Sequence, residues 1–276
     1  MTWWDDYNDG VRRLRETGWG ADASMLSREI CELLDDVDTA FAVTGADTPG
    51  WQDPHGDGTA PDEAEYERLT NPEKFLIVVS RARAWSRVLL DRGWAREASQ
   101  VDWALRPFDS GGTDTVLSPA ADGAVPLVLT THTPVDSDHI FTVTVAAGDP
   151  AVTLASIPDC GCDACDRGSA PLLEEMDRWV LSVVDGSLQV DVATDRSSVR
   201  TSFGGHGGTV QHLDQPTAFT AAPWPTNWTA RPIPPEVETR HPESAFPRTV
   251  IGSSASAVRL LLRDGPAGSA QRYRSL

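Results

Sequence analysis

The stretch that decides the fold is "AVTLASIPDCGCDACDRGSAPLLEEMDRWVLSVVDG", residues 151–186. It opens with residues 151–157, which are rich in β-branched and apolar side chains and are typical of a strand. After a short loop, apolar side chains recur at helical spacing, with Pro171 in the first turn and Gly186 just after the last apolar residue. The segment therefore predicts a strand, a cysteine-containing loop and an amphipathic helix over about 169–185.

Upstream, the pattern predicts helices first and strands afterwards. Residues 22–44 and 62–93 carry apolar side chains at helical spacing, and Asn71-Pro72 interrupts the second stretch. Strand-like runs follow at 124–131 and 140–146. Only residues 147–150 separate the run at 140–146 from the one at 151–157, so we expect an antiparallel hairpin there.

Together these elements predict an α+β fold, in which N-terminal helices pack on a mostly antiparallel sheet and the helix at about 169–185 lies within the strand order. We expect one domain over residues 1–214, with a helical part at about 1–95 and a sheet part at about 98–205. Within it, "GGHGG" at 204–208 is predicted to be a flexible turn. Residues 215–276 form a separate Pro-rich extended segment and tail, since eight prolines lie between Gln215 and Pro247.

Composition narrows the class of protein. The formal net charge is −18, which disfavours binding to nucleic acid or to an anionic membrane surface. No run of eighteen apolar residues predicts a transmembrane helix, and the first residues lack a secretory signal pattern. We therefore expect an acidic cytoplasmic protein, in a compartment where thiols stay reduced unless they bind metal or do redox work.

Three of the four cysteines, Cys160, Cys162 and Cys165, fall in the loop as Cys-x-Cys-x-x-Cys. Thiolates at this spacing can converge on one ion, and zinc is the predicted metal. Structural zinc takes four ligands, so a fourth must come from elsewhere. The candidates for this position are Cys31, His132 and His139, and the nearby acids Asp159, Asp163 and Asp166.

Two other interpretations of the loop stay open. Cys162 and Cys165 form a Cys-x-x-C pair before a helix, which is the setting of a redox-active dithiol. The flanking acids oppose this, because nearby negative charge disfavours a thiolate. Alternatively, the three cysteines stay reduced and simply close the strand against the helix.

The segment from Gly148 to Gly186, together with "RAWSRVLLDRGWA" at 83–95, resembles an uncharacterised actinobacterial group, the domain-of-unknown-function family 6226. The similarity is strongest over residues 148–186. It implies a cytoplasmic actinobacterial protein in which the Cys160, Cys162 and Cys165 loop is a family feature, and it implies no activity.

None of the common catalytic or nucleotide-binding signatures is present, which leans against an enzyme. The favoured function is a binding or interaction protein for a small molecule or a protein partner, with a structural zinc in the loop. The alternative is a metal- or thiol-dependent enzyme in which Cys162 is the nucleophile and His132 or His139 is the base.

Overall fold

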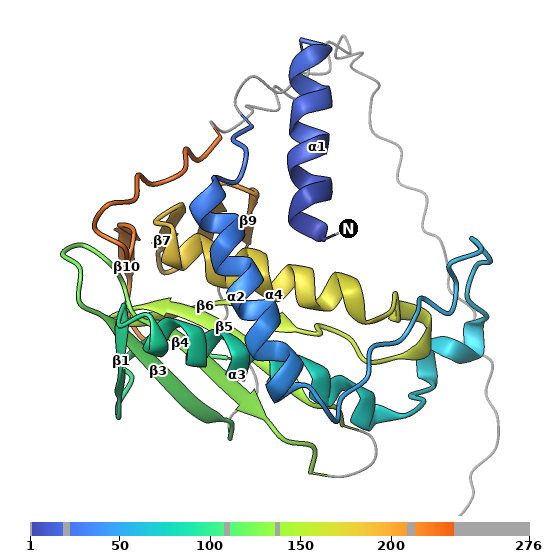
Figure 1. Cartoon of the computed structure of the whole chain (residues 1–276). Coiled ribbons are helices and arrows are strands. Elements are labelled where there is room, and N and C mark those ends of the chain that lie inside the picture. The colour runs from blue at the N-terminus through green and yellow to red at the C-terminus, as the bar shows by residue number, and fades with distance from the viewer. Residues whose placement is uncertain (1, 19–22, 108–110, 136–138, 209–212, 235–276) are drawn as a thin grey trace, which may run out of the picture. The chain divides into compact units, whose positions relative to one another are not determined.

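The computed structural model describes residues 2–18, 23–107, 111–135, 139–208 and 213–234 (Figure 1). These residues belong to one compact unit, Met1–Pro235. They form four α-helices, a six-stranded mixed sheet and a four-stranded antiparallel sheet, so the predicted α+β class is confirmed.

The larger sheet consists of β1 (Ala95–Ala98), β2 (Trp103–Leu105), β3 (Thr113–Pro119), β4 (Leu127–His132), β5 (Thr142–Gly148) and β6 (Ala151–Ile157), in the order β1-β3-β4-β5-β6-β2. Strands β5 and β6 form the expected antiparallel hairpin, in which Gly148 pairs with Ala151. Only β2 departs from the antiparallel pattern, because it runs parallel to β6 at the sheet edge. Along β4 the two-residue period separates the faces: Leu127 and Leu129 join the main core, and Val128 joins a smaller cluster on the other face.

The helices are α1 (Trp3–Glu16), α2 (Arg28–Thr44), α3 (Leu76–Asp91) and α4 (Ser169–Val184), and short 3₁₀ turns lie at Glu63–Glu67, Pro72–Phe75 and Asp163–Cys165. Helices α2 and α3 lie over one face of the larger sheet (Figure 1). Helix α2 lies within the predicted 22–44 helix, and α3 starts after the predicted break at Asn71-Pro72. Helix α1 was not predicted as a separate helix; its start is closed by a capping box between Thr2 and Asp5.

A buried carboxylate joins three of the helices. Asp177 of α4 is fully buried, and Arg81 of α3 donates to it from Nε at 2.8 Å and from Nη2 at 2.6 Å. The indole nitrogens of Trp85 and Trp3 donate at 2.7 Å and 3.0 Å. Because buried charges need partners, this four-donor arrangement fixes α1, α3 and α4 against one another.

The smaller sheet consists of β7 (Leu188–Val192), β8 (Ser197–Thr201), β9 (Gly204–Gly208) and β10 (Thr217–Thr220), in the order β10-β7-β8-β9. The predicted flexible turn at 204–208 is wrong, since this segment is β9 and pairs antiparallel with β8. Glycine has little intrinsic preference for a strand, but the backbone groups of β8 supply partners that override that preference.

The described part of the Pro-rich segment belongs to the same compact unit. Strand β10 pairs with β7, and Trp224 is buried, with its backbone N–H donating to Val184 at 2.9 Å. Arg231 donates from Nε to the buried Asp185 carboxylate at 2.6 Å. The remainder of the predicted tail, residues 235–276, lies outside the described residues.

Candidate metal centre

The three loop cysteines lie together between β6 and α4. Their sulfur atoms are all within 4.8 Å of one another, and the Cys160 thiol donates to the Cys162 sulfur at 3.3 Å. The short 3₁₀ turn brings Cys165 back toward Cys162, since the Cys165 N–H donates to the Cys162 carbonyl at 3.0 Å. Cys160 and Cys165 are exposed and Cys162 is half-buried. This cluster could hold a metal ion.

Asp163, which lies between Cys162 and Cys165, anchors the loop to Arg68 and Thr70. Its buried carboxylate accepts from the Thr70 N–H at 2.8 Å, from the Thr70 hydroxyl at 2.7 Å and from Arg68 Nε at 2.5 Å. In return, the Asp163 N–H donates to the Arg68 carbonyl at 2.8 Å. Burial alone would raise the pKa of Asp163, but these hydrogen bonds and the Arg68 charge hold it below its usual value.

Asp166 provides a second anchor on the other side of Cys165. Lys74 Nζ donates to its carboxylate at 2.6 Å, Trp51 Nε1 at 2.8 Å and the Gly168 N–H at 2.9 Å. Burial raises the pKa of Asp166, but the bonds from Lys74 and Trp51 outweigh it and the pKa is lowered. Both acids lie at the wall of a polar cavity of about 460 Å³ on the inner side of the loop. Because both carboxylates are occupied by these hydrogen bonds, neither Asp163 nor Asp166 is available as a fourth metal ligand.

Two glycines let the loop pack closely on its neighbours. A Cβ atom on Gly161 would lie 2.7 Å from Ile140 Cδ1. Gly168 has a φ of +82°, and a Cβ atom there would lie 2.7 Å from the backbone nitrogen of Asp53. A larger residue at either position would displace the loop, so these glycines contribute to the placement of the cysteines.

The thiols do not ionise independently. Burial tends to raise the pKa of Cys162, but hydrogen bonds from the Cys160 and Cys165 thiols and from two backbone N–H groups lower it overall. The same contacts, with Cys162 and Cys160, raise the pKa of Cys165 to about 12. The Cys162 thiolate is therefore stabilised, and its negative charge disfavours ionisation of Cys165. A bound cation would allow both thiols to ionise, because it offsets their mutual repulsion.

The structure places the three candidate fourth ligands in different surroundings. None of them belongs to the sulfur group found among the described residues. Cys31 lies on α2 and accepts from Asn8 Nδ2 at 3.7 Å, and His132 Nε2 lies 3.3 Å from the Thr144 hydroxyl. His139 directly precedes Ile140, the residue that packs on Gly161 of the loop. Of the three, His139 is thus the one whose chain neighbour contacts the cysteine loop.

The anchoring residues Trp51, Arg68, Thr70 and Lys74 were not predicted from the sequence. Their only sequence signal was the pair of acids inside the cysteine loop, which were interpreted as local charges. No pattern linked those acids to partners in the 45–75 region.

The fold and the cluster define an α+β protein with a three-thiol site that could bind a metal ion. No helix of the described residues combines the length and apolar character of a membrane span. The chain belongs to the Family of unknown function (DUF6226), whose model matches residues 37–232 and so includes the whole cysteine loop. The expected family resemblance is confirmed. No curated protein and no solved structure matches the chain.

Proposed function

We propose that this chain is a binding protein whose β6–α4 loop holds a structural zinc ion through Cys160, Cys162 and Cys165. The observation that carries the proposal is that the three sulfurs lie within 4.8 Å of one another. With Zn–S distances of about 2.3 Å, tetrahedral ligand sulfurs lie about 3.8 Å apart. The sulfurs therefore need only small movements to meet at one ion.

The surroundings of the cluster favour a structural role for the ion. The loop connects the last central strand of the larger sheet to α4, whose Asp177 joins three helices. An ion held there would stabilise the strand-to-helix junction directly, since metal that binds only the folded state contributes to the free energy of folding. The fourth ligand is water or His139, whose neighbour Ile140 contacts the loop; His139 lies outside the sulfur group of the described residues, so it would have to move to reach the ion.

The alternative function, an enzyme that uses a cysteine with His132 or His139 as base, needs an imidazole beside a sulfur. No histidine belongs to the sulfur group found in the described part of the chain. The binding role therefore has the stronger support. Its binding partner is a small molecule or another protein. The chain itself is an acidic protein that works in the cytoplasm.

The test is the metal content of untagged protein purified under reducing conditions, with a parallel count of reactive thiols. We expect about one zinc per chain and three thiols that react only after chelation. Cys162→Ser should lose the metal and lower the melting temperature, and Cys31→Ser should keep the metal as the matched control.

Three results would contradict the proposal in whole or in part. Metal-free protein with four freely reactive thiols would leave a purely structural turn. Metal-free protein with two thiols missing, restored by a reductant, would indicate a Cys162–Cys165 disulfide and a redox role. Full loss of metal in Cys162→Ser with unchanged melting would keep the site but remove its structural role.

A further inference from the structure

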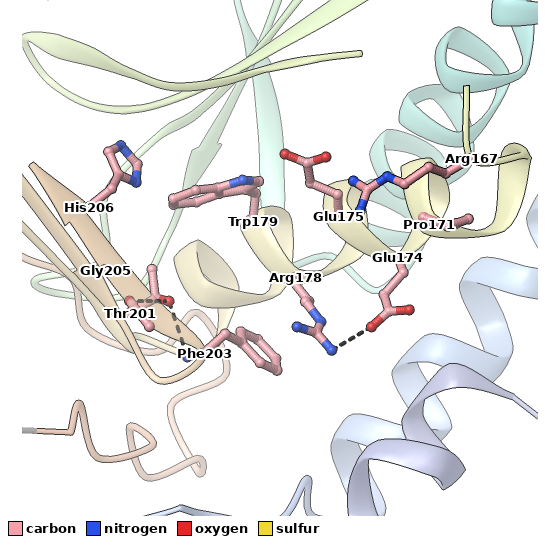
Figure 2. Close-up of a pocket in the computed structure, with 11 residues that line it drawn as sticks. Arg167, Pro171, Glu174, Glu175, Arg178, Trp179, Thr201, Phe203, Gly205 and His206 are labelled. Carbon is pink, nitrogen blue, oxygen red and sulfur yellow. Dashed lines mark hydrogen bonds and ion pairs between the residues drawn. The ribbon is translucent and has the colours of Figure 1, made fainter. Parts of the chain in front are cut away.

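A second cavity, of about 470 Å³, lies between α4 and the hairpin formed by β8 and β9. Figure 2 shows its side chains arranged along the helix, with Trp179 and His206 at one end and Arg167 and Glu175 at the other. The helix and the hairpin belong to different parts of the fold, so the cavity exists only in the folded protein. Its volume is within the range of about 300–1,000 Å³ that small-molecule sites occupy.

The hairpin end of the cavity is lined mainly by aromatic rings, with the Arg178 guanidinium beside them. The rings of Trp179 and His206 meet edge to face, with their centroids 5.4 Å apart. Phe203 is half-buried and lies against the guanidinium groups of Arg178, at 5.3 Å, and Arg231, at 4.3 Å. Partial burial of the imidazole lowers the pKa of His206, which favours its neutral form. This end therefore suits an aromatic ring.

Next to Trp179, toward the start of α4, the cavity carries two charges of opposite sign, Arg167 and Glu175. Arg178 is already neutralised by an ion pair with Glu174. Arg167 and Glu175 lie beside each other in Figure 2 and attract each other, and the Glu175 carboxylate also accepts a hydrogen bond from the Trp179 side chain. Burial and the negative charge of Asp159 raise the pKa of Glu175, and Arg167 acts in the opposite direction. A cation and an anion are thus presented side by side at the cavity mouth.

We infer that this cavity binds a free amino acid with an aromatic side chain. The carboxylate of the ligand pairs with Arg167, its ammonium group pairs with Glu175, and its ring packs at Trp179. These two neighbouring charges match a zwitterion whose charged groups are one carbon apart, and the aromatic end matches the side chain. A peptide fits less well, because its amine and its carboxylate lie at opposite ends. The proposed zinc site lies in the same loop before α4 that carries Arg167, but this inference does not require a bound metal.

The test is calorimetric titration of the purified protein, as isolated under reducing conditions, with three matched probes. L-phenylalanine carries both charges, phenylalaninamide lacks the carboxylate, and N-acetylphenylalanine lacks the ammonium group. We expect L-phenylalanine to bind about tenfold or more tightly than either derivative, since each derivative loses one charge-assisted hydrogen bond. L-tyrosine and L-tryptophan extend the series. Equal binding of one derivative, or no binding of any of the three amino acids below about 1 mM, would overturn the inference.

Two variants assign the charges. Arg167→Gln should weaken L-phenylalanine about tenfold and leave phenylalaninamide unchanged. Glu175→Gln should do the same for L-phenylalanine and leave N-acetylphenylalanine unchanged. Arg87→Gln on α3, whose side chain is 54% exposed, is the matched control. Equal weakening of all three probes by Arg167→Gln would show a general structural effect and contradict the assignment.

Discussion

Replacing Asp163 tests whether the protein holds the cysteine loop in place for the metal. The Asp163 carboxylate accepts two hydrogen bonds from Thr70, at 2.8 Å and 2.7 Å, and one from Arg68 Nε. The Arg68 side chain is 52% exposed, so solvent screens its share and we count only the two Thr70 bonds. At about 1 kcal/mol each, their loss costs about 2 kcal/mol of loop order.

If metal binding requires the ordered loop, that cost is subtracted from the free energy of binding. A loss of about 2 kcal/mol raises the dissociation constant for zinc about 30-fold. We therefore expect Asp163→Ala to bind zinc about 30-fold more weakly than the unmodified protein. The assay is competition with a chromophoric chelator under reducing conditions.

Asp159→Ala is the matched control, because it removes an equal charge from the same loop. Asp159 is exposed and does not belong to the group of possible ligand atoms found among the described residues, so its replacement leaves both the anchoring bonds and the three sulfurs intact. Any loss of affinity in this variant measures the charge alone, and the difference between the two variants measures the anchor. An equal loss in both variants would refute the reasoning, because the anchoring hydrogen bonds would then contribute nothing.

The remaining predictions concern the packing and the ionisation of the same region. Asp177→Asn breaks a buried charge pair, at a cost of about 3–5 kcal/mol. At about 2–4 °C per kcal/mol, calorimetry should show a melting temperature lower by about 6–20 °C. Asp91→Asn breaks only an exposed ion pair of 3.5 Å and should change the melting temperature little. Gly161→Ala should weaken zinc binding in the chelator assay, because the new Cβ lies 2.7 Å from Ile140 Cδ1, and Ile140→Val should recover part of the loss. The pKa of Asp166 is lowered in the folded state from an ordinary value of 3.8, so its contribution to stability is complete above that value and is lost as the pH falls through the lower folded value. Denaturant unfolding of metal-free protein should therefore show a steeper loss on acidification than unfolding of Asp166→Asn, and parallel profiles would contradict this.

Elements with an uninterrupted apolar pattern could be predicted from the sequence, and those held by partners could not. Helix α4 and the β5–β6 hairpin show their period directly. Helix α1 is mostly polar and is fixed by distant bonds, such as the one from Asn8 Nδ2 to the Leu26 carbonyl at 3.2 Å. Strand β9 is Gly-rich and takes its conformation from β8. Such tertiary effects override local preference.

The candidate site divides in the same way. The spacing of the cysteines was sufficient to predict that their sulfurs can converge. The anchors could not be predicted, because the partners of Asp166 lie 92 residues away at Lys74 and 115 residues away at Trp51. The charges of Arg167 and Glu175 gave no signal either, since acids and bases at such positions are usually solvated. Their significance depends on the hairpin that closes the cavity over them.

Lys74 is the only lysine among these 276 residues, and the loop anchor shields it, since its side chain is 18% exposed and paired with Asp166. A lysine-specific protease therefore has one cleavage site in the chain, directly before α3. Cleavage under native conditions requires the anchor to open, so its rate reports that local opening rather than global unfolding. A ligand that tightens the cysteine loop should slow the cut, and the protein thus contains a built-in proteolytic probe of the order of that loop.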